Sequence, residues 1–136
     1  MNALSSIKLL DEAAVIDLLP TIDVVQTMRQ LFCALGEDRA VQPPQTLSLL
    51  GDARGDFITY PGVLTERSVF GVKLSPYIVT DGRPIVTAWT LLMSSKTGAP
   101  LALVDASRLT TERTGATSAL AIDYRTPGRM PSGHNR

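Results

Sequence analysis

The sequence has little of what most metal-binding and nucleophilic sites are made of. Its 136 residues include one cysteine, Cys33, and one histidine, His134. A single cysteine cannot close a disulfide within the chain, and a metal site needs several ligands, so neither is expected. His134 lies in a polar stretch near the end, where a solvated side chain is the ordinary interpretation. The CxxC, HExxH, GxSxG, P-loop and GxGxxG signatures are absent as well.

An excess of charge of either sign is also lacking. Thirteen basic residues balance thirteen acidic ones, which makes nucleic acid and anionic membranes poor candidate partners. No stretch approaches the roughly 20 apolar residues of a membrane span, and the first ten residues do not resemble a signal peptide. We therefore expect a cytoplasmic chain with no membrane partner, which agrees with its single cysteine.

The first third of the chain has a helical pattern. Asp11 is predicted to cap a helix that Pro20 ends, and Thr21 to cap a second helix that ends at Gly36. Apolar residues recur in the second helix at helical spacing, namely Ile22, Val25, Met28, Phe32 and Leu35. Cys33 lies beside that face and is interpreted as a small core residue.

From residue 41 to residue 106 the pattern is that of strands. The Pro-Pro stretch "VQPPQTLSLL" is predicted to be extended. Three segments are rich in β-branched and aromatic residues and are bounded by Gly, Asp and Pro, namely "DFITYPGVL", "SVFGVKLSPYIV" and "PIVTAWTLLMS". "PLALVDA" is predicted to be the returning strand of a hairpin. Gly98 in "SSKTGAP" can adopt the positive φ of a hairpin loop. Strands adjacent in sequence favour a mostly antiparallel sheet with helices packed on one side. A helical period returns after Ser107, so the fold class is α+β.

Two cations stand out within apolar surroundings. Lys73 interrupts an apolar strand, where it either faces water or points inward and needs a negatively charged partner. Arg113 lies on the same predicted helical row as Leu109, Ala116 and Leu120. It either reaches back to the surface or points into a pocket as a bidentate donor to a carboxylate or phosphate. The residue pattern leaves both alternatives open.

The stretch "TGAPLALVDASRLTTERTGATSALA" resembles the ornithine cyclodeaminase/mu-crystallin family. That family has a "TGxPLAL" hairpin followed by "LTxxRTxAxSALA" on a helix, and Leu109, Thr110, Arg113 and Thr114 recur here in order and spacing. The upstream "VQPPQTLSL" and "VFGVKLSP" are similar to the family's first substrate-domain strands, so the resemblance covers most of the chain.

The resemblance implies an NAD- or NADP-dependent enzyme that acts on a small amino acid or cyclic imino acid. The family's activities are amino-acid cyclodeamination, a lyase reaction, together with dehydrogenation and imino-acid reduction. Family members form homodimers through the substrate domain. The resemblance assigns Lys73, Arg113 and Gln45 to the substrate, and Arg113, Thr114 and Thr87 to the cofactor. It assigns no catalytic acid or base to this chain.

The chain departs from the family pattern in three places. Gln45 stands where the family often has a carboxylate-binding arginine, and Ile85 stands where it has a cofactor-contacting threonine, which leaves Thr87 as a nearby substitute. The family continues into a Rossmann domain, whereas this chain reads "AIDYRTPGRMPSGHNR". We therefore expect a substrate-binding and dimerisation domain over residues 1–125 and an irregular tail over 126–136, produced by truncation or a frame change near Tyr124.

Two hypotheses from different classes follow. In the first, the chain is the substrate-binding half of an NAD(P)-dependent amino-acid or imino-acid enzyme, inactive by itself and unable to bind the cofactor alone. In the second, it is a non-catalytic module that self-associates or binds small amino acids.

Overall fold

The computed structural model describes residues 7–125, so the predicted tail 126–136 and His134 lie outside the described residues. The elements in order are β1 (Lys8–Leu10), α1 (Glu12–Leu18), η2 (Leu19–Thr21), α2 (Val24–Gly36), β2 (Ala40–Val41), β3 (Thr46–Leu49), β4 (Gly55–Leu64), η3 (Thr65–Arg67), β5 (Val69–Ile78), β6 (Ile85–Val86), β7 (Trp89–Ser94), β8 (Pro100–Asp105) and α3 (Ser107–Arg125). This confirms the α+β fold class.

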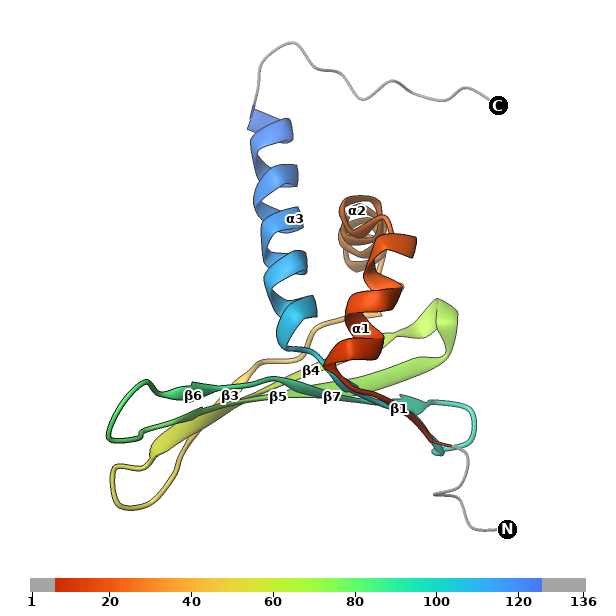
Figure 1. Cartoon of the computed structure of the whole chain (residues 1–136). Helices are drawn as coiled ribbons and strands as arrows, with labels where there is room; N and C mark the ends of the chain where they lie inside the picture. The colour runs from red at the N-terminus through yellow and green to blue at the C-terminus, as the bar shows by residue number, and fades with distance from the viewer. Residues whose placement is uncertain (1–6, 126–136) are drawn as a thin grey trace, which may run out of the picture.

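The strands form one mixed sheet of eight strands in the described part of the chain. Its order is β1-β8-β7-β5-β4-β2, with β3 paired to β4 and β6 paired to β5. All pairs are antiparallel except β1 with β8. The three helices lie on the same face of the sheet (Figure 1), as predicted from the sequence. β1 was not predicted, because three residues are too few to show an alternating pattern.

The helix boundaries follow from the capping side chains. The Asp11 carboxylate accepts a hydrogen bond from the Ala14 amide at 2.9 Å, which confirms the first predicted cap. The prediction of Thr21 as the second cap is wrong. Its hydroxyl donates to the Leu18 carbonyl at 2.6 Å, and Asp23 caps α2 by accepting from the Gln26 amide at 2.9 Å. Thr21 still belongs to η2, and α2 begins only at Val24, so the residue in the capping position is Asp23.

The end of α2 and the position of Cys33 also differ from expectation. Gly36 is the last helical residue, but Asp38 adopts the left-handed conformation of the turn, with φ of 57°. Cys33 is exposed, so its interpretation as a core residue is wrong. The buried residue of α2 is the adjacent Ala34, which is 1% exposed, whereas Cys33 borders the open hollow between α2 and α3.

α3 begins at the sheet and runs away from it beside α2 (Figure 1). Its buried residues are Ala116 and Leu120, two members of the row predicted to face inward. Only the first turns of α3 are near the strands, and these turns carry Thr110 and Arg113. None of the helices in the described part of the chain is long and apolar enough to cross a membrane.

The face of the sheet opposite the helices is uncovered and apolar in its centre. Lys73 contacts α3, so Leu74, the next residue on β5, points to the opposite face, as does Phe70. Trp89 is the cross-strand partner of Leu74 and shares its face. These three side chains are 38% (Phe70), 41% (Leu74) and 36% (Trp89) exposed. A chain of this size rarely leaves such a patch uncovered in its working state.

Candidate functional site

A hollow of about 400 Å³ lies where the base of α3 meets the helix-covered face of the sheet. It is lined by Val24, Gln42, Gln45, Tyr60, Lys73, Thr90, Ala106, Leu109, Thr110 and Arg113. The register of three neighbouring strands forms its floor, because Tyr60 of β4 and Thr90 of β7 are both direct partners of Lys73 on β5. Partners in a sheet project to the same side, so all three side chains face the hollow.

The Lys73 ammonium has two neighbours within this hollow. Its Nζ donates a hydrogen bond to the Thr110 hydroxyl oxygen at 3.3 Å. The same nitrogen lies 4.3 Å from the centroid of the Tyr60 ring, a distance typical of a cation–π interaction. Lys73 is half-buried. Of the two alternatives for its orientation, the structure therefore shows the inward one.

Arg113 follows Thr110 by about one turn of α3 and lines the same hollow. Its side chain is exposed to solvent and also borders the hollow, so it both reaches the surface and faces the pocket, the two alternatives predicted for it. Neither Arg113 nor Lys73 forms an ion pair with a described residue, and no Asp or Glu lines the hollow. Two positive charges thus face one cavity without a negative one. Such an arrangement favours an anionic ligand.

The electrostatics of Lys73 point to the same class of ligand. Burial lowers the pKa of the Lys73 ammonium below its ordinary value of 10.5, and the nearby positive charge of Arg113 lowers it further. Both effects act against the charged form of the lysine. A carboxylate placed between the two cations would reverse the second effect and partly compensate the first. A bound anion should therefore stabilise the charged form of Lys73 more than it would stabilise a solvated lysine on the surface.

The structure brings together three of the five predicted site residues. Gln45 lines the hollow with Lys73 and Arg113. Thr114 lies on the exposed side of α3 and donates its hydroxyl to the Thr110 carbonyl at 2.7 Å. Thr87 follows β6, where its amide donates to the Pro76 carbonyl at 3.4 Å. Neither threonine is among the lining residues, so their contact with a cofactor stays a prediction.

Four polar residues of the hollow were missed by the sequence reasoning. Thr110 precedes Arg113 by three residues on the predicted helix, and that spacing could have identified it. Gln42 lies three residues before Gln45 and lines the hollow with it. Tyr60 and Thr90 face Lys73 only through strand register, which the sequence does not specify. They could not have been assigned without the structure.

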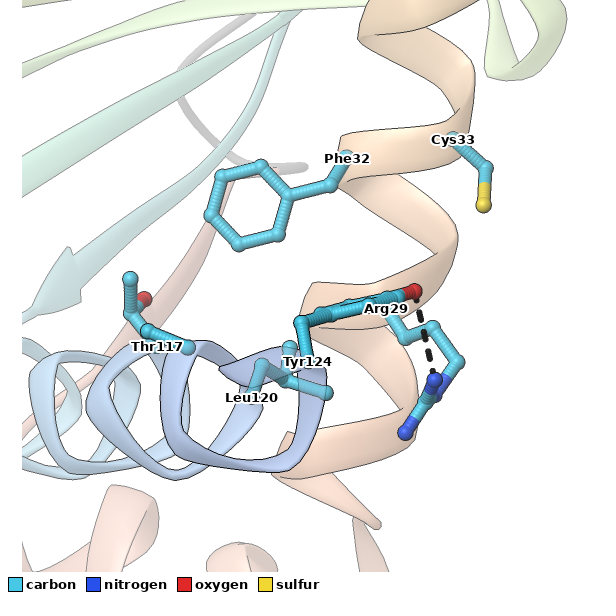
Figure 2. A pocket seen from close by; sticks show the side chains of 7 residues that line it. Arg29, Phe32, Cys33, Thr117, Leu120 and Tyr124 are labelled. Carbon is cyan, nitrogen blue, oxygen red and sulfur yellow. Dashed lines mark hydrogen bonds between the residues drawn. The ribbon is translucent and has the colours of Figure 1, made fainter. Parts of the chain in front are cut away.

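A second hollow, of about 380 Å³, lies between α2 and α3 (Figure 2). Phe32 extends over it from α2 toward Thr117 and Leu120 of α3. Its only cation, Arg29, is already engaged, donating to the Tyr124 hydroxyl at 3.4 Å and lying 3.9 Å from the Asp123 carboxylate. This mostly apolar hollow has no unpaired charge to offer a substrate. Nor do three or more His, Cys, Asp or Glu side chains gather as a metal site anywhere in residues 7–125.

A relative of known activity is similar to most of the chain. An NAD(P)H-dependent anabolic L-arginine dehydrogenase of Pseudomonas aeruginosa is 55% identical over 119 residues, which cover 88% of this chain. The same match covers 38% of that enzyme. The chain therefore spans well under half the length of this relative.

Solved structures show the same fold. The Δ1-pyrroline-2-carboxylate reductase of Thermococcus litoralis, determined with NADH and L-proline, matches with a TM-score of 0.78 and 30% identity, over 87% of this chain and 38% of that one. An archaeal alanine dehydrogenase dimer with bound NAD matches with a TM-score of 0.76 and 27% identity, over 87% of this chain and 37% of that one.

The resemblance carried by the hairpin and the arginine helix is thereby confirmed. The relatives are NAD(P)-dependent amino-acid dehydrogenases and imino-acid reductases. The sequence model of the ornithine cyclodeaminase/mu-crystallin family matches residues 8–128, which is nearly the whole chain. The chain belongs to the ornithine cyclodeaminase/mu-crystallin family.

Proposed function

We propose that this chain is the substrate-binding part of an NAD(P)-dependent enzyme that interconverts an amino acid and its imino acid. The observation that carries the proposal is the pair of cations, Lys73 and Arg113, that face one hollow with no carboxylate in its lining. Together they can hold the α-carboxylate of the substrate through charge-assisted hydrogen bonds. Holding that group at two points orients the adjacent Cα, which is what hydride transfer at this carbon requires.

The nicotinamide cofactor supplies or accepts the hydride in such a reaction. Of the three residues predicted to contact it, Arg113 fits this role best, because its guanidinium is exposed and forms no ion pair with a described residue. Thr114 already donates its hydroxyl within its own helix. We therefore place Arg113 between substrate and cofactor, and residues 1–125 as the domain that binds substrate and dimerises.

L-Arginine is the first substrate to test, because the L-arginine dehydrogenase is 55% identical to this chain. The amides of Gln42 and Gln45 line the hollow and offer neutral hydrogen-bonding groups to a substrate side chain. Reduction of a cyclic imino acid is the second candidate. It is favoured by the 30% identical reductase that was determined with L-proline.

Nuclear magnetic resonance on the chain itself tests the carboxylate assignment. The chain has three lysines, Lys8, Lys73 and Lys96, so each side-chain signal can be followed separately. We expect L-arginine to shift the Lys73 and Arg113 signals in a saturable way and to leave Lys8 and Lys96 unchanged. L-Argininamide, which lacks the carboxylate, should not shift them. A parallel titration with L-proline compares the affinity for the second candidate class of substrate with that for L-arginine. Equal shifts with L-arginine and L-argininamide would contradict the proposal.

We also propose that the uncovered face of the sheet is a dimer interface. Its centre is apolar, and the archaeal alanine dehydrogenase is described as a dimer. Sedimentation velocity at tens of micromolar is expected to show a dimer for the unmodified chain and a monomer for Leu74→Glu. A carboxylate placed opposite its own copy in an apolar interface would be buried without a partner.

Leu18→Glu is the matched control for this prediction. Leu18 lies on α1 and is 46% exposed, close to the 41% of Leu74, but it belongs to the helical side of the fold. This variant should remain dimeric. An unmodified chain that sediments as a monomer would contradict the proposed interface, as would a dimeric Leu74→Glu variant.

A further inference from the structure

We infer that Tyr60 and Thr110 are positioning residues that hold the Lys73 ammonium so that one of its N–H groups faces the hollow. This inference rests on the proposed function, in which Lys73 binds the substrate carboxylate. It adds to that function the two side chains that fix the direction of the charge.

The donors of the ammonium can be counted. A lysine ammonium has three N–H groups and no acceptor. The Thr110 hydroxyl takes one of them at 3.3 Å, and the face of the Tyr60 ring, 4.3 Å from Nζ, takes a second. No other described residue forms a hydrogen bond with Nζ. The third N–H is left for a ligand, and its direction is set by the other two.

Both positioning side chains are attached to well-fixed backbone. Tyr60 is the direct cross-strand partner of Lys73, within a ten-residue pairing of β4 with β5. Thr110 lies in the first turn of α3, and the start of this helix is anchored to Ala88, the residue directly before β7. The Ala106 amide donates to the Ala88 carbonyl at 2.7 Å, and the Ala88 amide donates to the Ser107 hydroxyl at 3.2 Å. The two contacts therefore approach Lys73 from two separately held elements.

A lysine needs such contacts more than an arginine does. Its ammonium is a point charge on a flexible four-carbon stem, whereas the arginine fork is planar and carries its own direction. Without the ring and the hydroxyl, the Lys73 side chain would sample several rotamers, and a substrate would have to order it on binding.

The two contacts also favour the charged form of the lysine. The titratable groups that line the hollow beside Lys73 are Tyr60 on β4 and Arg113 on α3. Burial and Arg113 lower the pKa of Lys73. A ring face and a hydroxyl acceptor both interact more strongly with the charged ammonium, so we expect them to oppose this lowering. Removing either contact should therefore lower the pKa of Lys73 further. Because a carboxylate binds the charged form, affinity is lost as pH rises through this pKa, and a variant should lose it at lower pH.

The test compares disruptive and conservative variants of the same positions. Tyr60→Leu removes the ring and Tyr60→Phe keeps it, while Thr110→Val removes the hydroxyl and Thr110→Ser keeps it. Two quantities are measured in the complete chain by nuclear magnetic resonance. They are the pKa of Lys73, from the pH titration of its Cε signal, and the dissociation constant for L-arginine. The Lys8 and Lys96 signals are internal references.

Tyr60→Leu and Thr110→Val are expected to lower the pKa of Lys73 and to weaken L-arginine binding about three- to thirtyfold. Tyr60→Phe and Thr110→Ser should stay within about twofold of the unmodified chain, which a general packing defect would not allow. The inference is overturned if the disruptive variants keep both the original pKa and the original affinity.

The outcome also separates this inference from the proposed function. If the unmodified chain shows no saturable response to either L-arginine or L-proline, the carboxylate proposal fails. A lower pKa of Lys73 in Tyr60→Leu than in Tyr60→Phe would still support the positioning of the ammonium. If Lys73→Met abolishes binding while Tyr60→Leu leaves pKa and affinity unchanged, the function stands and the positioning inference fails.

Discussion

Lys73→Met is expected to lower kcat/KM by roughly 30- to 1000-fold in a chimera that carries residues 1–125 in place of the matched part of the Pseudomonas aeruginosa L-arginine dehydrogenase. The two sequences are 55% identical over 119 residues, so we expect the exchanged segment to keep most of its contacts with the rest of the enzyme. The substitution removes the half-buried ammonium while keeping the length of its stem. Losing one partner of a desolvated charge pair costs about 2–4 kcal/mol, which corresponds to the stated factor.

Arg113 should respond in the same direction, and its conservative variant is informative. Arg113→Ala removes the second cation, and Arg113→Lys keeps the charge but loses the planar fork. We expect both to lower kcat/KM, Arg113→Ala by a similar factor to Lys73→Met. An Arg113→Lys variant with nearly full activity would show that Arg113 does not grip a planar anion, and its assignment would be withdrawn.

Controls in the same chimera separate charge at the site from charge elsewhere. Lys96→Met removes a lysine from the hairpin loop, and Arg108→Ala removes an arginine of α3 that pairs with Glu112 at 3.1 Å. Both should leave kcat/KM within about twofold, since surface substitutions have small effects.

Thermal unfolding distinguishes a lost contact from a lost fold. Lys73 is half-buried without a carboxylate beside it, so replacing its ammonium with a thioether should leave stability unchanged or slightly higher. A chimera with Lys73→Met that unfolds at the original temperature and retains full turnover would contradict the carboxylate role. So would equal losses for Lys73→Met and Lys96→Met.

The central strands could be predicted from the sequence because their signals are local. β4, β5 and β7 lie in runs rich in β-branched and aromatic residues, and β8 follows the hairpin loop in which Gly98 adopts the predicted positive φ, of 70°. β1 has no such signal. It is three residues long and pairs with β8, whose residues lie more than ninety positions later in the chain.

The faces of the helices were harder to predict than their existence. A helical period shows that α2 has an apolar side, but the neighbouring helix decides which part of that side is buried. α2 buries Ala34, whereas Phe32 and Cys33 stay exposed and line the hollow between α2 and α3. The misassignment of Cys33 follows from this rotation, which one helix alone does not specify.

The candidate site was predictable only in part for the same reason. Lys73 and Arg113 were each conspicuous in their own element, as cations in apolar or small-residue surroundings. Their meeting in one hollow depends on α3 returning to the sheet after β8, and Tyr60 enters it through the register of β4 with β5. Side chains brought together by register and docking leave no spacing in the sequence to detect.

The second large effect, on the free energy of unfolding, is expected at two glycines of the sheet where no side chain can be accommodated. Gly55→Ala should lower the free energy of unfolding by roughly 2–4 kcal/mol, because Gly55 adopts φ of 123° and a Cβ there would lie 1.9 Å from the Tyr77 carbonyl oxygen. Gly71→Ala should have a similar effect without any unusual φ. Its Cβ would lie 2.5 Å from the Leu91 carbonyl oxygen on the adjacent strand β7.

These losses are large because neither clash can be relieved by a side chain. Both oxygens belong to backbone held in the ladder of the sheet, so relief requires the strands to separate and lose hydrogen bonds.

Gly115→Ala is the matched control, since Gly115 lies inside α3 and a Cβ added there would meet nothing within 4 Å. It should stabilise the chain by up to about 1 kcal/mol, the ordinary helical preference for alanine. Urea unfolding followed by circular dichroism measures all three. A Gly71→Ala variant within about 0.5 kcal/mol of the original chain would show that β5 and β7 are less closely paired than the register indicates.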